Sequence, residues 1–77
     1  MNESTEILFM QTRLIRLASE RWHLSIEHVI QLFKTNDVFK YIEIGYGIFH
    51  CESDDAVLDE IEQFIERKGV NVYAGVI

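Results

Sequence analysis

The segment that is most informative about the fold is residues 24–69, LSIEHVIQLFKTNDVFKYIEIGYGIFHCESDDAVLDEIEQFIERKG. Apolar side chains recur here every three or four residues with charged side chains between them, which is the period of amphipathic helices. Residues that favour helix starts precede three such segments, namely Ser25, Asp37 and Asp54. The stretch therefore predicts three helices, at about 26–34, 38–45 and 55–68.

Glycines predict where two of these helices end. Gly45 and Gly47 should stop the helix that begins at Val38, and Gly69 should stop the last helix in a left-handed conformation. Upstream, an apolar stripe that includes Ile7 and Leu8 predicts a further helix at about 5–22, capped by Ser4 or Thr5.

The expected fold is therefore all-α, a small four-helix domain that spans residues 1–77. Its core should combine the apolar faces of all four helices: Leu14, Ile15, Ala18, Trp22, Val29, Phe33, Ile42, Ile61, Phe64 and Ile65.

The tail at 70–77 has a different pattern. Val70, Val72, Ala74 and Val76 alternate with other residues in the two-residue period of a strand, so we expect an extended or strand-like tail. An isolated strand is unstable. The tail should therefore pack irregularly on the helices, pair with the same segment of a second copy in a homodimer, or pair with a different protein.

Composition narrows the classes of protein. The formal net charge is -6, and acids dominate after Lys40, so nucleic acid is a disfavoured partner and a basic protein surface a better one. The single cysteine excludes an intramolecular disulfide, and neither a secretion signal nor an apolar run of about 20 residues is visible. We expect a cytoplasmic location without membrane contact.

No residue pattern indicates catalysis, a cofactor or a metal. His50 and Cys51 are adjacent and should point apart, while His23 and His28 straddle a turn, so neither pair has the spacing of a zinc site. The glycines form no phosphate-binding loop. We therefore predict that the protein is not an enzyme and that Cys51 is either a structural thiol or a bystander without a role.

A few residues stand out from the helical pattern. Gln11 lies within the apolar stripe of the first helix, so it should be a core amide bonded to a neighbouring helix end. His50 should be partly buried, bonded to backbone, Tyr46 or Tyr41, and structural in role. Candidate partner-binding residues project outward or form an acidic edge: Phe9, Arg13, Arg16, Asp59, Glu62, Glu66 and Tyr73.

A DNA-binding regulator of the helix-turn-helix type is the alternative function. Short helices around the Ser25 cap favour it, and Arg13, Arg16 and Arg21 would contact phosphates. The segment from Val38 would be the recognition helix, but Lys40 is its only basic residue. This makes the alternative the weaker of the two.

The core residues also carry a family resemblance. The positions Leu24, Ser25, Val29, Leu32, Phe33, Val38, Tyr41, Ile42, Tyr46, Phe49 and His50, followed by Asp59, Glu60, Ile61, Phe64 and Ile65, resemble the bacterial domain of unknown function 3791. Its members are small bacterial intracellular proteins without assigned catalytic residues. Some are encoded beside a family similar to ADP-ribosyltransferases, so the resemblance implies an antitoxin or regulatory partner of an adjacent toxin-like enzyme.

Overall fold

The computed structural model of the chain describes residues 2–74, and four α-helices account for most of them. The elements are α1 (Glu3–Trp22), α2 (Ile26–Thr35), α3 (Val38–Phe49) and α4 (Asp54–Glu66), followed by a short 3-10 helix, η1 (Val72–Ala74). The all-α prediction is confirmed. No helix within the described residues is both long enough and apolar enough to cross a bilayer.

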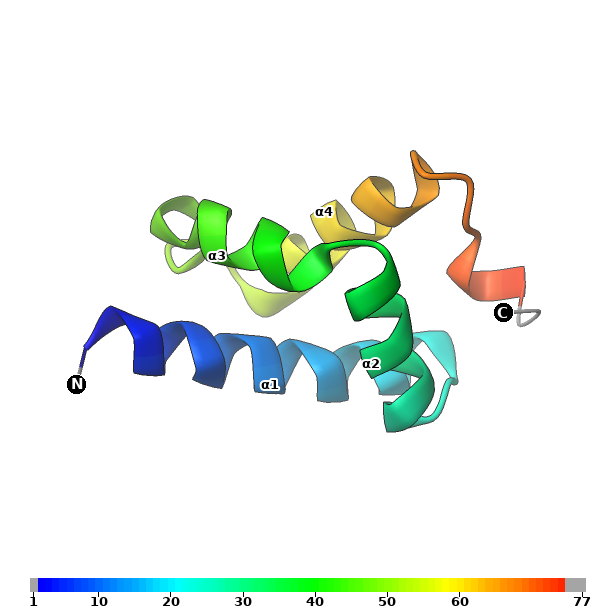
Figure 1. Cartoon of the computed structure of the whole chain (residues 1–77), viewed down its shortest axis with the longest axis horizontal. Helices are drawn as coiled ribbons and strands as arrows, with labels where there is room; N and C mark the ends of the chain where they lie inside the picture. Colours follow the sequence, from blue (N-terminus) through cyan, green and yellow to red (C-terminus); the bar gives the residue numbers. More distant parts are fainter. Residues whose placement is uncertain (1, 75–77) are drawn as a thin grey trace.

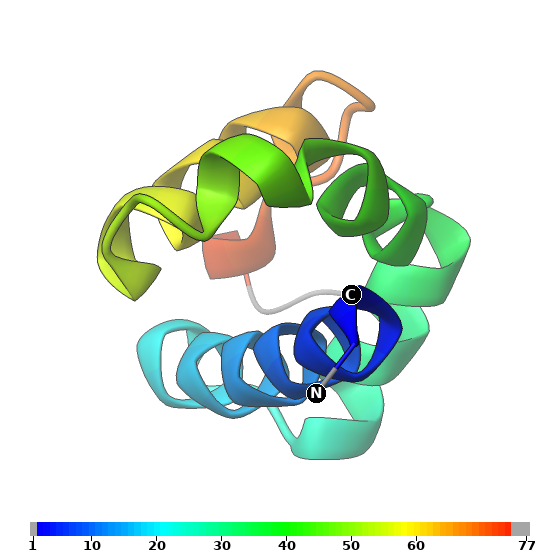
Figure 2. The same ribbon diagram turned by 90° about the vertical axis from the view of Figure 1, so that its left-hand side faces the viewer.

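The helices form two layers that are joined at one end. The long helix α1 forms one layer, and α3 and α4 lie side by side in the other, as Figures 1 and 2 show. The short helix α2 runs between the layers at the end where α1 stops and α3 begins (Figure 1). The core therefore lies between α1 and the α3–α4 layer, with α2 closing one end.

Every helix contributes to this core. Its buried apolar side chains are Met10, Leu14, Ala18, Trp22, Val29, Leu32, Phe33, Val38, Ile42, Phe49, Val57, Leu58, Ile61, Ile65 and Val72. At its centre the fully buried Phe33 ring meets Trp22 and Phe39 edge-on, with ring centroids 6.3 and 5.5 Å apart. Of the ten core residues expected from the sequence, eight are buried, and Ile15 and Phe64 are partly buried against the others.

Two apolar residues are exposed: Leu8, from the expected stripe of the first helix, and Ile26, which the helical period places on the same face as Val29 and Phe33. Leu8 is 57% exposed. It follows the partly buried Ile7 by one residue, so its side chain points about 100° further round the helix. Ile26 is the first residue of α2, within a turn whose neighbours Ser25 and Glu27 are also exposed. For both residues the assignment to a buried face was wrong.

The helix caps differ from the sequence prediction at three places. Asn2, not Ser4 or Thr5, caps α1, because its side chain accepts a hydrogen bond from the Thr5 amide at 2.9 Å. Ser53 caps α4 through the Ala56 amide at 3.1 Å, so Asp54 is the first helical residue.

The third difference is Asp37, which precedes α3 but makes no capping bond. Its backbone is left-handed, with φ at 59°, and it forms the tight turn between α2 and α3. Ser25 does cap α2, through the His28 amide at 3.1 Å.

Helix α3 continues through Gly45 and Gly47 to Phe49, so the expected stop at these glycines was wrong. Glycine destabilises a helix interior by only about 1 kcal/mol, which burial of a Phe side chain outweighs. The extra turn buries Phe49, and a Cβ at Gly45 would lie 2.5 Å from the Phe49 ring. Gly45 thus leaves space for the Phe49 ring, and burial of this ring stabilises the longer α3 helix.

The described part of the tail does not support the strand-like prediction, because residues 70 and 71 have no regular structure and the next three residues are helical. Residues Val72–Ala74 form η1, and the Val72 side chain is fully buried against the same chain. Gly69 has the predicted left-handed conformation, with φ at 90°, but α4 ends earlier, at Glu66. The remainder of the expected strand, residues 75–77, lies outside the described residues.

Candidate functional site

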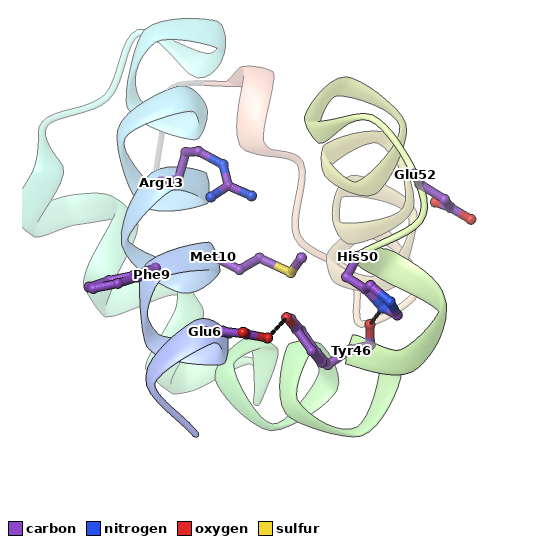
Figure 3. A pocket seen from close by; sticks show the side chains of 7 residues that line it. All are labelled: Glu6, Phe9, Met10, Arg13, Tyr46, His50 and Glu52. Carbon is purple, nitrogen blue, oxygen red and sulfur yellow. Dashed lines mark hydrogen bonds between the residues drawn. The ribbon is translucent and has the colours of Figure 1, made fainter. Parts of the chain in front are cut away.

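A surface groove of about 230 Å³ opens between the first half of α1 and the second half of α3 (Figure 3). Its lining residues are Glu6, Phe9, Met10, Arg13, Tyr46, His50 and Glu52. Met10 extends from α1 toward α3 and forms the buried floor, while the 52% exposed Phe9 ring projects from α1 to the side away from α3. The groove therefore combines apolar, aromatic and charged side chains from two helices and a loop.

The α3 wall of the groove is held by hydrogen bonds. The Tyr46 hydroxyl donates to Glu6 Oε1 at 2.8 Å, and this bond raises the pKa of Tyr46 above its ordinary value. The Tyr46 ring stacks on His50, with centroids 5.1 Å apart. His50 Nδ1 lies 2.9 Å from the Tyr46 carbonyl oxygen, which can only accept, so Nδ1 carries the proton.

His50 is exposed, so its expected partial burial was wrong, although the expected backbone hydrogen bond is present. Its Nε2 atom faces Cys51, whose sulfur lies 3.6 Å away. The two side chains therefore do not point apart as expected. No group of three or more potential metal ligands was found among the residues that the structure describes.

The positive charge beside the groove is neutralised. Arg13 forms a bidentate ion pair with Asp54, with Nε to Oδ2 at 2.8 Å and a second bond at 3.1 Å. The hydrogen bonds to Asp54 raise the pKa of Arg13, and the pair ties α1 to the start of α4. Glu6 and Glu52 then leave the groove with an acidic rim.

Across the molecule, the predicted acidic edge is largely occupied by its own chain. Arg21 contacts Asp59 at 2.6 Å and Glu62 at 3.3 Å, and it also lies 3.4 Å from Asp55. Glu62 accepts further hydrogen bonds from Trp22 Nε1 at 2.6 Å and the Tyr73 hydroxyl at 2.5 Å. Only 15% of the Glu62 side chain is exposed, so the expectation of a freely exposed edge was wrong for this residue.

The other predicted residues are dispersed. Gln11 is partly buried, and its Nε2 donates to the Phe39 carbonyl at 3.1 Å, which links α1 to the start of α3. Arg16 and Glu66 are exposed on α1 and α4, and Tyr73 is exposed except at its hydroxyl contact with Glu62. Of the candidate partner-binding residues, only Phe9 and Arg13 line the groove.

Sequence reasoning missed Glu6, Met10, Tyr46 and Glu52 as groove residues. Glu6 and Tyr46 are 40 positions apart, and no local spacing relates them. Their proximity follows from the way in which α3 crosses α1, which only the packed structure defines.

Two carboxyl groups, those of Glu52 and Glu60, interact with each other next to the groove. Glu52 shares a hydrogen bond with Glu60, which raises the pKa of Glu52 above its ordinary value. Glu60 Oε2 is buried and has no hydrogen-bond partner among the described residues. The nearby Tyr41 has a raised pKa as well, first because it is buried and second because of the Glu60 charge.

These features define an all-α protein with a groove between α1 and α3 that is lined by apolar, aromatic and acidic side chains. The protein family described as "protein of unknown function (DUF3791)" matches residues 9–68, and the chain belongs to this family. No curated protein and no solved structure matches the chain.

Proposed function

We propose that this protein is a non-enzymatic interaction module that binds a basic segment of another protein in the groove between α1 and α3. The observation that carries the proposal is the groove itself, which has an apolar floor, aromatic walls and an acidic rim. Exposed apolar side chains beside complementary charge are typical of protein-binding surfaces.

The charges favour a lysine or an arginine as the anchoring group of the partner. Arg13 is paired with Asp54, whereas Glu6 and Glu52 remain as rim acids. A cation that binds beside Glu6 can also lie over the ring of Tyr46, where a cation–π contact adds to the attraction. The net charge of -6 supports fast association with a basic surface.

The partner in this proposal is a toxin-like enzyme encoded by the adjacent gene, so that this chain acts as its antitoxin or regulatory subunit. The support is the gene arrangement that the family resemblance implies, together with the acidic groove. The proposal places the protein in the bacterial cytoplasm without a cofactor.

The test is co-purification of this chain with the product of the adjacent gene, followed by an assay of whether the chain relieves that product's toxicity. Phe9→Ala should weaken the complex about tenfold, because an exposed aromatic side chain beside the groove that packs on the partner can carry a large share of the binding energy. Leu8→Ala is the matched control, since Leu8 is similarly exposed but does not line this groove. No complex and no relief of toxicity would overturn the antitoxin proposal.

DNA binding has less support from the positions of the arginines. Two of the three expected phosphate contacts, Arg13 and Arg21, are engaged in ion pairs with α4, which leaves Arg16. The two functions differ in salt response: affinity for DNA falls steeply with salt concentration, by orders of magnitude when several phosphates are contacted. Steeply salt-sensitive DNA binding that Arg16→Ala abolishes would favour the DNA-binding regulator.

A further inference from the structure

Helix α3 presents an apolar surface to solvent on the side away from α1. Ile44 is 74% exposed and Ile48 is 67% exposed, and because they are four residues apart they lie next to each other on one face of the helix. Lys40 and Gly47 are also exposed and share this face by helical spacing. We refer to Lys40, Ile44, Gly47 and Ile48 as the outward face of α3.

Gly47 makes room for no other part of the chain among the residues that the structure describes. Glycine in a helix interior is less stable than alanine, and a Cβ at Gly47 would meet no atom within 4 Å. Gly45 differs, since it accommodates the Phe49 ring. A glycine that weakens the helix, makes no room for a neighbour and lies beside two exposed isoleucines is what close packing against another helix requires.

Charge argues for a second copy of this chain as the occupant of the face. Residues 44–51, IGYGIFHC, contain no Asp, Glu, Lys or Arg in a chain of net charge -6. A charged partner would therefore meet no side chain of opposite charge in this segment. A second copy offers an identical uncharged surface, so the like charges of two acidic chains are kept away from the centre of contact.

The ends of α3 indicate the relative orientation. Lys40 lies near the positive N-terminal end of the helix dipole, where its charge is unfavourable, and the last turn of α3 contains no basic residue. When two α3 helices pack antiparallel, Lys40 of each copy approaches the negative C-terminal end of the other. The midpoint between Ile44 and Ile48 then lies on the two-fold axis.

We propose that the outward face of α3 is a homodimer interface in which two α3 helices pack antiparallel, with Gly47 at the point of closest approach. The proposal does not rest on the proposed partner protein. Tyr46 and His50 line the groove on the side of α3 that faces α1, so each copy in the dimer keeps its groove open.

The first test is the solution mass by light scattering, from low to high micromolar protein. We expect about twice the 9.1 kDa chain mass. Ile44→Lys combined with Ile48→Lys should give a monomer with unchanged helicity by circular dichroism. Leu8→Lys combined with Phe9→Lys is the matched control, exposed apolar side chains on α1, and should remain a dimer. A monomeric parent, a dimeric Ile44/Ile48 variant or a monomeric control would each overturn the proposal.

The second test uses oxidative cross-linking to determine the orientation. In the antiparallel arrangement, position 44 of one copy lies opposite position 48 of the other, whereas the two copies of position 44 are offset by about 6 Å along the axis at the 1.5 Å rise per residue of a helix. Ile44→Cys combined with Ile48→Cys, in a Cys51→Ser background, should therefore form a disulfide-linked dimer rapidly, and Ile44→Cys alone in the same background should do so much more slowly. Equally fast cross-linking of the two variants would overturn the antiparallel arrangement.

Discussion

Glu62 joins three parts of the chain at the scale of single residues. It accepts hydrogen bonds from the buried Trp22 at 2.6 Å and from Tyr73 at 2.5 Å, and Arg21 lies 3.3 Å away. Glu62→Ala should lower the free energy of unfolding by about 1–3 kcal/mol, because the indole N–H of Trp22 would stay buried without an acceptor. Urea unfolding measures this loss.

Glu66→Ala is the control for this prediction, since Glu66 is exposed on the same helix and its removal should change stability by less than about 0.5 kcal/mol. Equal effects of the two substitutions would show that the contacts of Glu62 add nothing to stability.

A second prediction at the residue scale concerns Glu52, whose pKa is raised by its hydrogen bond to Glu60. The folded protein therefore holds this proton more tightly than the unfolded chain does. The stabilisation is complete below the ordinary glutamate pKa of about 4.3 and is lost as the pH rises through the higher folded pKa. Glu60→Gln should lower the pKa of Glu52, because an amide can donate to the carboxylate.

NMR titration of the Glu52 carboxyl group, with thermal melting across the same pH range, measures both effects. Glu66→Gln should leave the titration unchanged. A Glu52 pKa that is the same in the parent and in Glu60→Gln would rule out the carboxyl pair as its cause.

At the scale of elements, the two glycines of α3 should respond in opposite directions to alanine. Gly45→Ala should destabilise the fold, since its Cβ would lie 2.5 Å from the Phe49 ring. Gly47→Ala should stabilise the chain by about 0.5–1 kcal/mol, because its Cβ would enter open space on a helix. Both are best compared by chemical unfolding in the Ile44→Lys, Ile48→Lys background, where dimerisation cannot contribute. Changes of the same sign would contradict the packing of α3.

At the scale of the whole molecule, stability depends on the packing of Phe33 between the two layers. Phe33→Ala should cost about 3–5 kcal/mol, which is comparable with the entire stability of a small domain, so cooperative unfolding should be lost. Phe64→Ala should cost less, because Phe64 is only partly buried. Differential scanning calorimetry tests both. A Phe33→Ala melting temperature within about 2 °C of the parent would disprove this core.

The four helices could be predicted from the sequence, because helix formation depends on interactions between residues only a few positions apart. Ser25 bonds the amide three positions later, and the apolar spacing places Leu14, Ala18 and Trp22 on one side of α1. These interactions involve residues that are close in sequence, so they can be predicted without knowledge of the rest of the fold.

The end of α3 and the set of residues that form the groove could not be predicted from local sequence, because both depend on tertiary packing. The Phe49 ring overrides two helix-weakening glycines once a core exists to bury it. Glu6 meets Tyr46, and Trp22 meets Glu62, each across 40 positions. Such pairs depend on the angle and register at which helices cross, and these are set by the packing of the whole core rather than by any local segment.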